Sequence, residues 1–193
     1  NIASLHRSMS DYTNSLIFAK KSLKIYKSEL GKLHPETLSV YRFLAGTYYL
    51  SKEYKSSLEC INIALEAYSK LEKRQPEGEI NLKILLGCIY IQIADFDKAQ
   101  QVLTNTQELY HQFERKVDKD LLNRIYVNLA SLKLKQQATI EALAYFLKIA
   151  SNRRKRYHEN HLILRTTYTD IGFCYYKLGD YDKALVYHRK SLA

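Results

Sequence analysis

Apolar side chains recur every three to four residues along most of the chain, which is the spacing of helices that bury one face. The clearest stretch has its apolar positions at Leu38, Tyr41, Leu44, Ala45 and Tyr48. A second stretch follows it, with apolar positions at Leu58, Ile61, Ala64 and Leu65. Polar residues 51–53 separate the two, and Pro35 stands at the start of the first, where a missing N–H does no harm. This part of the chain therefore predicts two helices joined by a short turn.

The same pattern returns at a nearly constant interval. A small residue recurs at spacings of 42, 42, 43 and 42, at Ala3, Ala45, Gly87, Ala130 and Gly172. Nine positions after each of them stand Tyr12, Tyr54, Phe96, Thr139 and Tyr181, so that only the fourth unit lacks an aromatic residue. Five matches in register indicate a repeated helix pair.

The small residue has a physical purpose in such a pair. It lets two helix backbones approach closely, while aromatic side chains from the facing helix pack around the contact. One pair cannot bury its apolar face alone, and stacked pairs form a continuous core. The repeat therefore predicts an all-α solenoid.

The turn residues make this pattern resemble a known family. Glu53-Tyr54 in one unit and Asp180-Tyr181 in another follow the small residue and open the second helix, as in the tetratricopeptide repeat. Residues 30–35, Leu-Gly-Lys-Leu-His-Pro, resemble the opening of units in the kinesin-light-chain-type subgroup, whose repeat is longer than the family's usual ~34 residues. The resemblance implies an α-α superhelix, a right-handed solenoid of antiparallel helix pairs.

The register of the repeat predicts one continuous array over residues 1–193. Its expected units are a partial repeat at 1–28, full repeats at 35–70, 77–112 and 119–154, and a near-complete repeat at 161–193. Both ends interrupt a unit, so we expect the chain to be a fragment of a longer protein.

Cysteine usage and hydropathy bear on location. Cys60, Cys88 and Cys174 are an odd number, lie far apart and sit within apolar helical patterns, which favours reduced structural thiols. No apolar run approaches the ~18 residues of a membrane span. We therefore expect a cytoplasmic protein, compatible with association with the cytoskeleton.

The sequence carries no recognisable catalytic motif. Phosphate-binding loops, nucleophile elbows and HExxH are all missing, and the acidic residues form no paired acid and base. His158 and His161 are the one closely spaced histidine pair, but the register places them in a turn without a third ligand, which favours a capping role. The prediction is a protein without enzymatic activity, cofactor or metal.

In the tetratricopeptide family, the first helix of each pair lines a concave groove that binds extended peptides or partner helices. The resemblance places these positions of the chain in that groove: Arg7, Arg42, Tyr49, Ile84, Ile91, Gln92, Arg124, Lys135, Tyr176 and Lys177. Half of them are basic and none is acidic, in a chain whose formal net charge is +10. A positive groove attracts acidic segments. We therefore expect a protein partner, recognised through an acidic, partly apolar linear motif or helix, as in cargo adaptors of the kinesin-light-chain type.

Two alternatives stay open at this point. The run of basic residues 153–156 is also typical of nuclear-localisation signals and nucleic-acid contacts, although a solvated helix end explains it more simply. The other alternative is an architectural subunit of a large cytoskeletal, ciliary or ubiquitin-ligase assembly that packs through its convex faces. Exposure of Val102, Ile149 and Val186 on the second helices would favour this architectural role.

Overall fold

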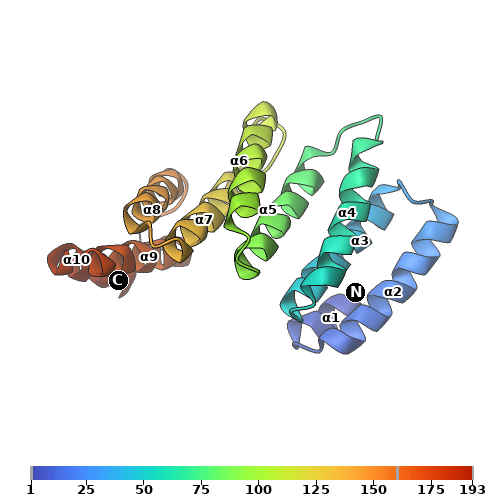
Figure 1. Cartoon of the computed structure of the whole chain (residues 1–193), viewed down its shortest axis with the longest axis horizontal. Coiled ribbons are helices and arrows are strands. Elements are labelled where there is room, and N and C mark those ends of the chain that lie inside the picture. The colour runs from blue at the N-terminus through green and yellow to red at the C-terminus, as the bar shows by residue number, and fades with distance from the viewer. Residues whose placement is uncertain (1, 160, 193) are drawn as a thin grey trace. The chain divides into compact units, whose positions relative to one another are not determined.

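The computed structural model describes residues 2–159 and 161–192, and these residues form helices joined by short turns (Figure 1). Asn1 and Ala193, the outermost residues of the first and last predicted repeats, lie outside the described residues. Within the described ranges the helices are α1 Ile2–Ser8, α2 Tyr12–Glu29, α3 Pro35–Leu50, α4 Tyr54–Ser69, α5 Pro76–Gln92, α6 Phe96–Phe113, α7 Asp120–Lys135, α8 Thr139–Arg154, α9 Leu162–Lys177 and α10 Tyr181–Leu192. The predicted all-α class and the alternation of first and second helices are confirmed.

The chain divides into two compact units within α5. Unit 1 covers residues 1–89 and unit 2 covers residues 90–193. In unit 1, α2 packs on both α1 and α3, and α3 packs on α4. In unit 2, neighbouring helices pack in chain order from α6 to α10. The expected continuity of the repeats into one array stays a prediction.

Close contact at the small residue organises unit 1. Ala45 is fully buried, and the hydroxyl of Ser57 on α4 donates a hydrogen bond of 2.7 Å to its carbonyl. Ser15 on α2 does the same to the carbonyl of Ala3 on α1, at 2.9 Å. A backbone carbonyl can receive such a bond from the facing helix only if no bulky side chain separates the two. Around these contacts lie buried Leu38, Leu44 and Ile61, and other core residues.

The corresponding positions of unit 2 are packed without the serine. Ala130 on α7 and Ala142 on α8 are both fully buried, as are Ile125 and Leu129. In the last pair, a Cβ added to Gly172 would lie 2.8 Å from the ring of His188 on α10. The approach of this histidine therefore requires glycine.

The turn within each helix pair has a fixed backbone form. One residue in each turn has a positive φ between 59° and 79°, at Ser10, Lys52, Ala94, Gln137 and Gly179. The residue that follows returns its N–H to the carbonyl five positions earlier, as in Asp11 to His6 and Asp180 to Tyr175. This is the Schellman arrangement, in which a left-handed residue ends a helix and satisfies its last carbonyls.

Side chains at the helix starts complete the turns. Asp11, Asp95 and Asp180 each accept a backbone hydrogen bond three residues into the second helix. His34 and His161 cap α3 and α9, because each Nδ1 accepts an N–H two residues ahead at 3.2 Å. The capping role predicted for the His158 and His161 pair is therefore confirmed for His161.

Two of the three cysteines are structural thiols. Cys174 is fully buried and Cys60 is half-buried, and burial raises the pKa of both thiols to about 11. A thiol with such a pKa stays protonated at neutral pH and is a poor nucleophile. No helix in the described ranges is both long and apolar enough to cross a membrane.

Candidate functional site

All ten predicted groove positions lie on first helices. Arg7 is on α1, Arg42 and Tyr49 are on α3, and Ile84 is on the part of α5 in unit 1. The positions in unit 2 are Ile91 and Gln92 at the end of α5, Arg124 and Lys135 on α7, and Tyr176 and Lys177 on α9.

In unit 1 the two basic groove positions, Arg7 and Arg42, interact with aromatic side chains of the same unit. The guanidinium of Arg7 lies 4.2 Å from the centre of the Phe43 ring, across the contact between α1 and α3. Burial raises the pKa of Tyr68 on α4, and the positive charge of Arg42 works against that rise. Both arginines are half-buried. These cations are therefore partly engaged in holding unit 1 together.

Tyr49 also packs locally. Its ring centre lies 6.0 Å from that of Tyr54 across the turn between α3 and α4, and it is only half-buried. Ile84 and Ile91, by contrast, are 3% and 5% exposed. They offer almost no surface to a ligand, so their predicted place in the groove is wrong and its apolar surface must come from other residues.

Unit 2 presents a more open first-helix surface. Arg124 and Lys135 on α7 and Lys177 on α9 are exposed, and Tyr176 is 60% exposed. The ammonium of Lys177 lies 5.6 Å from the centre of the Phe173 ring, which is itself 43% exposed. Tyr176 and Tyr181 lie with their ring centres 5.8 Å apart. Cations and exposed aromatic surface therefore lie side by side on α9.

The groove predicted from the sequence omitted Phe173. It directly follows the small residue Gly172, a position that the sequence analysis did not assign to the groove. On α9 the small residue faces α10, and the helical turn carries the next side chain about 100° away, toward solvent. That offset is the signal that could have found it.

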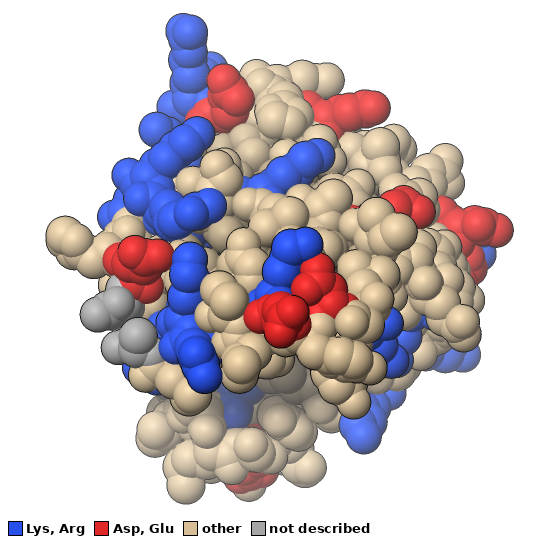
Figure 2. Space-filling model, turned by 90° about the vertical axis from the view of Figure 1, so that its left-hand side faces the viewer, with Lys and Arg blue, Asp and Glu red and all other residues tan. Residues whose placement is uncertain are grey.

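Several acidic side chains form ion pairs with nearby lysines. The pKa of Asp95 is held low by the hydrogen bond from Lys98, and that of Asp180 by the hydrogen bond from Lys183, both 2.7 Å long. Because the chain has 30 Lys and Arg against 20 Asp and Glu, a surplus of cations faces solvent. Figure 2 shows Lys and Arg gathered along one edge of the side that faces left in Figure 1, with acidic side chains more scattered.

The basic run 153–156 does not act as one patch. Arg153 points inward, where its Nη1 donates to the Ile163 carbonyl at 3.1 Å and to the Thr167 hydroxyl at 2.6 Å. It therefore joins the end of α8 to α9. Arg154, Lys155 and Arg156 are exposed. A nucleic-acid contact through all four cations is incompatible with the structural role of Arg153.

Comparisons with known proteins agree with this architecture. The family model described as tetratricopeptide repeat matches residues 1–70 and 121–193. Regulatory protein RapD of Bacillus subtilis (strain 168) is 32% identical over 121 residues, which are 61% of this chain and 32% of RapD. The chain thus spans about a third of the length of that relative.

Two solved structures illustrate the similarity of fold. The Rap conjugation gene regulator of the plasmid pLS20, in complex with the Phr* peptide, superposes with a TM-score of 0.80 at 14% identity, covering 98% of this chain and 50% of that one. Kinesin-light-chain-like repeats from Podosopora anserina give a TM-score of 0.77 at 14% identity, covering 98% and 89%.

Proposed function

Because the chain belongs to the tetratricopeptide repeat family, we propose that it is a non-enzymatic protein-interaction scaffold whose first helices bind an acidic, partly apolar linear motif or partner helix. Helix pairs that stack in register present one side chain after another along a common face, which suits an extended ligand. The Rap regulator, which shares this fold, was solved with a peptide bound. That precedent supports a peptide ligand here. A cytoplasmic location is part of the proposal, supported by Cys60, Cys88 and Cys174, which form no disulfide in the described part of the chain.

One observation carries the chemical part of the proposal. On α9 an exposed lysine stands over an exposed phenylalanine ring, Lys177 over Phe173, with Tyr176 one position away. An acidic side chain could pair with the ammonium while an adjacent apolar side chain covers the rings. Exposed aromatic residues of this kind are enriched at binding hot spots. Arg124 and Lys135 on α7 add positive charge to the first helices of the same unit.

The test compares two charge reversals of equal size. The groove variant carries Arg124→Glu, Lys135→Glu and Lys177→Glu. The control variant carries Lys148→Glu, Arg189→Glu and Lys190→Glu, which lie on the second helices α8 and α10 and are exposed. Each changes the formal net charge from +10 to +4. Both are measured against an array of peptides in which the number of acidic and of aromatic residues varies independently.

We expect the groove variant to lose acidic peptides that the wild type and the control variant retain. Adding aromatic residues to an acidic peptide should further strengthen binding to the wild type. Equal loss of binding in both variants would show that net charge alone explains the attraction, and would contradict a groove. Retention of all peptides by the groove variant would contradict it as well.

The architectural alternative receives uneven support from the second helices. Ile149 is fully buried and Val102 is half-buried, whereas Val186 is 51% exposed. Ile140 on α8, at 72% exposed, adds one more apolar side chain on that side of a pair. Protein partners lost only in an Ile140→Ser, Val186→Ser variant would favour packing through the second helices.

A further inference from the structure

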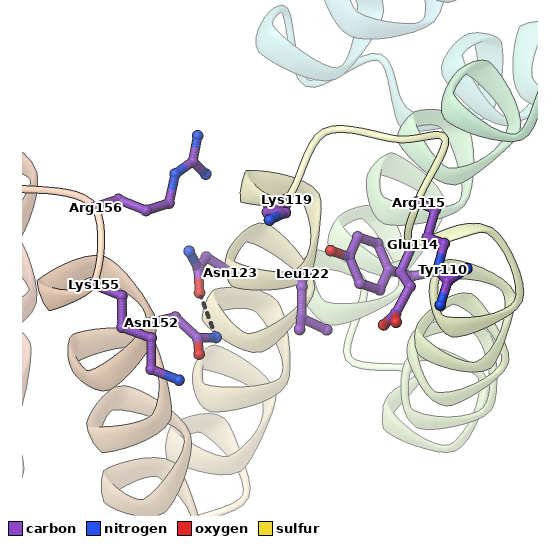
Figure 3. Close-up of a pocket in the computed structure, with 9 residues that line it drawn as sticks. All are labelled: Tyr110, Glu114, Arg115, Lys119, Leu122, Asn123, Asn152, Lys155 and Arg156. Atoms are coloured by element: carbon purple, nitrogen blue, oxygen red, sulfur yellow. Dashed lines mark hydrogen bonds between the residues drawn. The ribbon is translucent and has the colours of Figure 1, made fainter.

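Unit 2 contains a pocket of about 520 Å³ at the ends of three helices (Figure 3). We call it the amide pocket, after the Asn123 and Asn152 pair at its base. Its lining comes from the end of α6, from the start of α7 and the loop before it, and from the end of α8 and the loop after it. Residues far apart in the sequence thus converge on one cavity. None of the ten predicted groove positions lines it.

The base of the amide pocket is fixed by hydrogen bonds. Asn152 Nδ2 donates to Asn123 Oδ1 at 3.1 Å, across the contact between α8 and α7. Asn123 Nδ2 in turn donates to Asp120 Oδ1 at 3.3 Å, and Asn123 is only 3% exposed. A hydrogen-bonded pair of which one member is buried and the other half-buried restricts both side chains. The cavity is therefore built on a rigid base.

Tyr110 adds a phenol to the lining of this cavity. The residue as a whole is 4% exposed. Figure 3 shows the hydroxyl directed toward Lys119 and Asn123. Burial raises the pKa of Tyr110, so the phenol keeps its proton and can donate a hydrogen bond to a ligand.

Positive charge surrounds the pocket. Arg115, Lys119, Lys155 and Arg156 line it, and in the described part of the chain none of them lies within 4.0 Å of a carboxylate. The acidic lining residue is Glu114, whose carboxylate lies 3.6 Å from His111. Among the residues that line the pocket, four are cationic and one is acidic, and a bound anion would relieve this excess of positive charge.

Two acidic side chains near the start of α7 are already engaged. Asp118 Oδ1 accepts the Asp120 N–H at 2.9 Å, and Asp120 accepts from Asn123. They shape the base of the pocket and do not pair with its lysines or arginines. In Figure 3 the side chains of Arg156 and Lys119 lie above the Asn123 and Asn152 pair, while Arg115 lies beside Tyr110.

We propose that the amide pocket binds a phosphate monoester. A phosphate dianion presents three oxygens in three directions, and it is matched by donors of several kinds: guanidinium, ammonium and phenol. Arginine binds phosphate with two parallel hydrogen bonds, which fits the exposed guanidinium of Arg156. A planar carboxylate would engage fewer of these donors. The pocket volume leaves room for the group that carries the phosphate, either a phosphorylated side chain of a partner or a small phosphorylated molecule.

The experiment uses the whole chain and four probes. They are a short glycine peptide with one phosphoserine, the same peptide with glutamate in its place, glycerol phosphate and inorganic phosphate. NMR of the Asn123 and Asn152 side-chain amides reports where each probe binds, and titration gives its affinity. The pocket variant carries Lys119→Gln and Arg156→Gln. The matched control carries Lys116→Gln and Arg154→Gln, two exposed cations of neighbouring segments that do not line the pocket.

We expect phosphate probes to shift both amides and to lose about tenfold or more in affinity in the pocket variant, because a hydrogen bond to a charged group contributes about 1.5–3 kcal/mol. The control should stay within about twofold of the wild type, and Tyr110→Phe should weaken binding about threefold, as loss of one hydrogen bond predicts. A phosphopeptide that binds more tightly than glycerol phosphate identifies a partner side chain as the source, and equal affinities identify a small molecule.

Three results would overturn the proposal: unmoved amides, equal weakening in the pocket variant and the control, or equal binding of the glutamate peptide. This test does not depend on the proposed function, because the pocket and the groove positions are separate. Loss of phosphate binding with intact binding of acidic peptides would reject only the pocket. The opposite outcome would reject only the groove.

Discussion

The first helices of the two units use their basic groove positions differently. In unit 1, Arg7 is half-buried and stacks on Phe43 of the next first helix. In unit 2, Lys177 stands over Phe173 on its own helix and remains exposed. Arg7 therefore joins two helices, whereas Lys177 covers a ring that a ligand could also cover. A basic residue in the groove register is therefore available to a ligand only where it is not already packed against a neighbouring helix.

The contact at the small residue should be equally intolerant in both units. Replacing Ala45 or Ala130 with leucine places a large side chain at a fully buried helix contact. Each substitution should reduce the free energy of unfolding by about 1–3 kcal/mol, because the core has no space for it. Chemical denaturation followed by circular dichroism measures the change. Wild-type stability in either variant would show that close approach is not what the small residue provides.

The difference between the two cations can be measured directly. Arg7→Ala should destabilise unit 1 by about 1 kcal/mol, because it removes a cation from the Phe43 ring together with its packing. Lys177→Ala should change stability by less than about 0.5 kcal/mol, as expected for an exposed site. Thermal unfolding of the two variants side by side tests the contrast. Equal effects would remove the distinction between a structural and an available cation.

The turns offer a comparison that runs across both units. Lys52 in unit 1 and Gln137 in unit 2 have positive φ without being glycine. Lys52→Gly and Gln137→Gly should each stabilise the chain by about 0.5–1 kcal/mol, because relief of the strained φ outweighs the added flexibility of the unfolded chain. Gly179→Ala is the reverse control, since nothing lies within 4 Å of the added Cβ and only the backbone is strained. A stabilising effect of Gly179→Ala would contradict this reasoning.

One carboxyl group in each unit, Glu79 in unit 1 and Asp170 in unit 2, should respond to acid in the opposite direction to the other. In unit 1, burial pushes the pKa of Glu79 upward, but hydrogen bonds and charges of Lys83 and Arg74 outweigh it and leave the pKa below its usual value. Its contribution is therefore present above the unfolded-state pKa and is lost as the pH falls through the lower folded-state pKa. In unit 2, burial raises the pKa of Asp170. Its contribution is present below the unfolded-state pKa and is lost as the pH rises through the folded-state pKa.

The test of this pH dependence is a pair of neutral variants. Glu79→Gln should make stability less sensitive to acid below about pH 5. Asp170→Asn should remove a gain of stability on acidification. Both effects should occur at pH values near the ordinary carboxyl pKa values. Unfolding midpoints measured between about pH 3 and pH 7 report both effects. If a substitution left the slope of stability against pH unchanged, the expectation for that residue would be wrong.

The sequence predicted the features that repeat. The positions of Ala45, Ala130 and Gly172 set the register, and the structure places all three at buried helix contacts, because a contact repeated in every pair leaves a periodic trace. The left-handed turn residues left no such trace. Only Gly179 among them is a glycine, and the form of the turn follows from the backbone hydrogen bonds that end each helix.

Features that depend on a neighbouring element could not be predicted from one helix. The inward path of Arg153 depends on Ile163 and Thr167 of the next helix. The amide pocket likewise requires α6, α7 and α8 to converge. The burial of Ile84 was also missed, because a helix that is apolar on several sides, as α5 is, does not indicate which side faces solvent.

The central claim is that the first helices of unit 2 hold an acidic, partly apolar ligand, and hydrogen exchange tests it most directly. The chain would be measured alone and saturated with the acidic aromatic peptide that binds best in the array. We predict slower exchange in α7 and α9, with little change in α8 and α10, and no slowing in the variant with Arg124→Glu, Lys135→Glu and Lys177→Glu. Protection confined to α8 and α10 would contradict the claim and place the binding surface on the second helices.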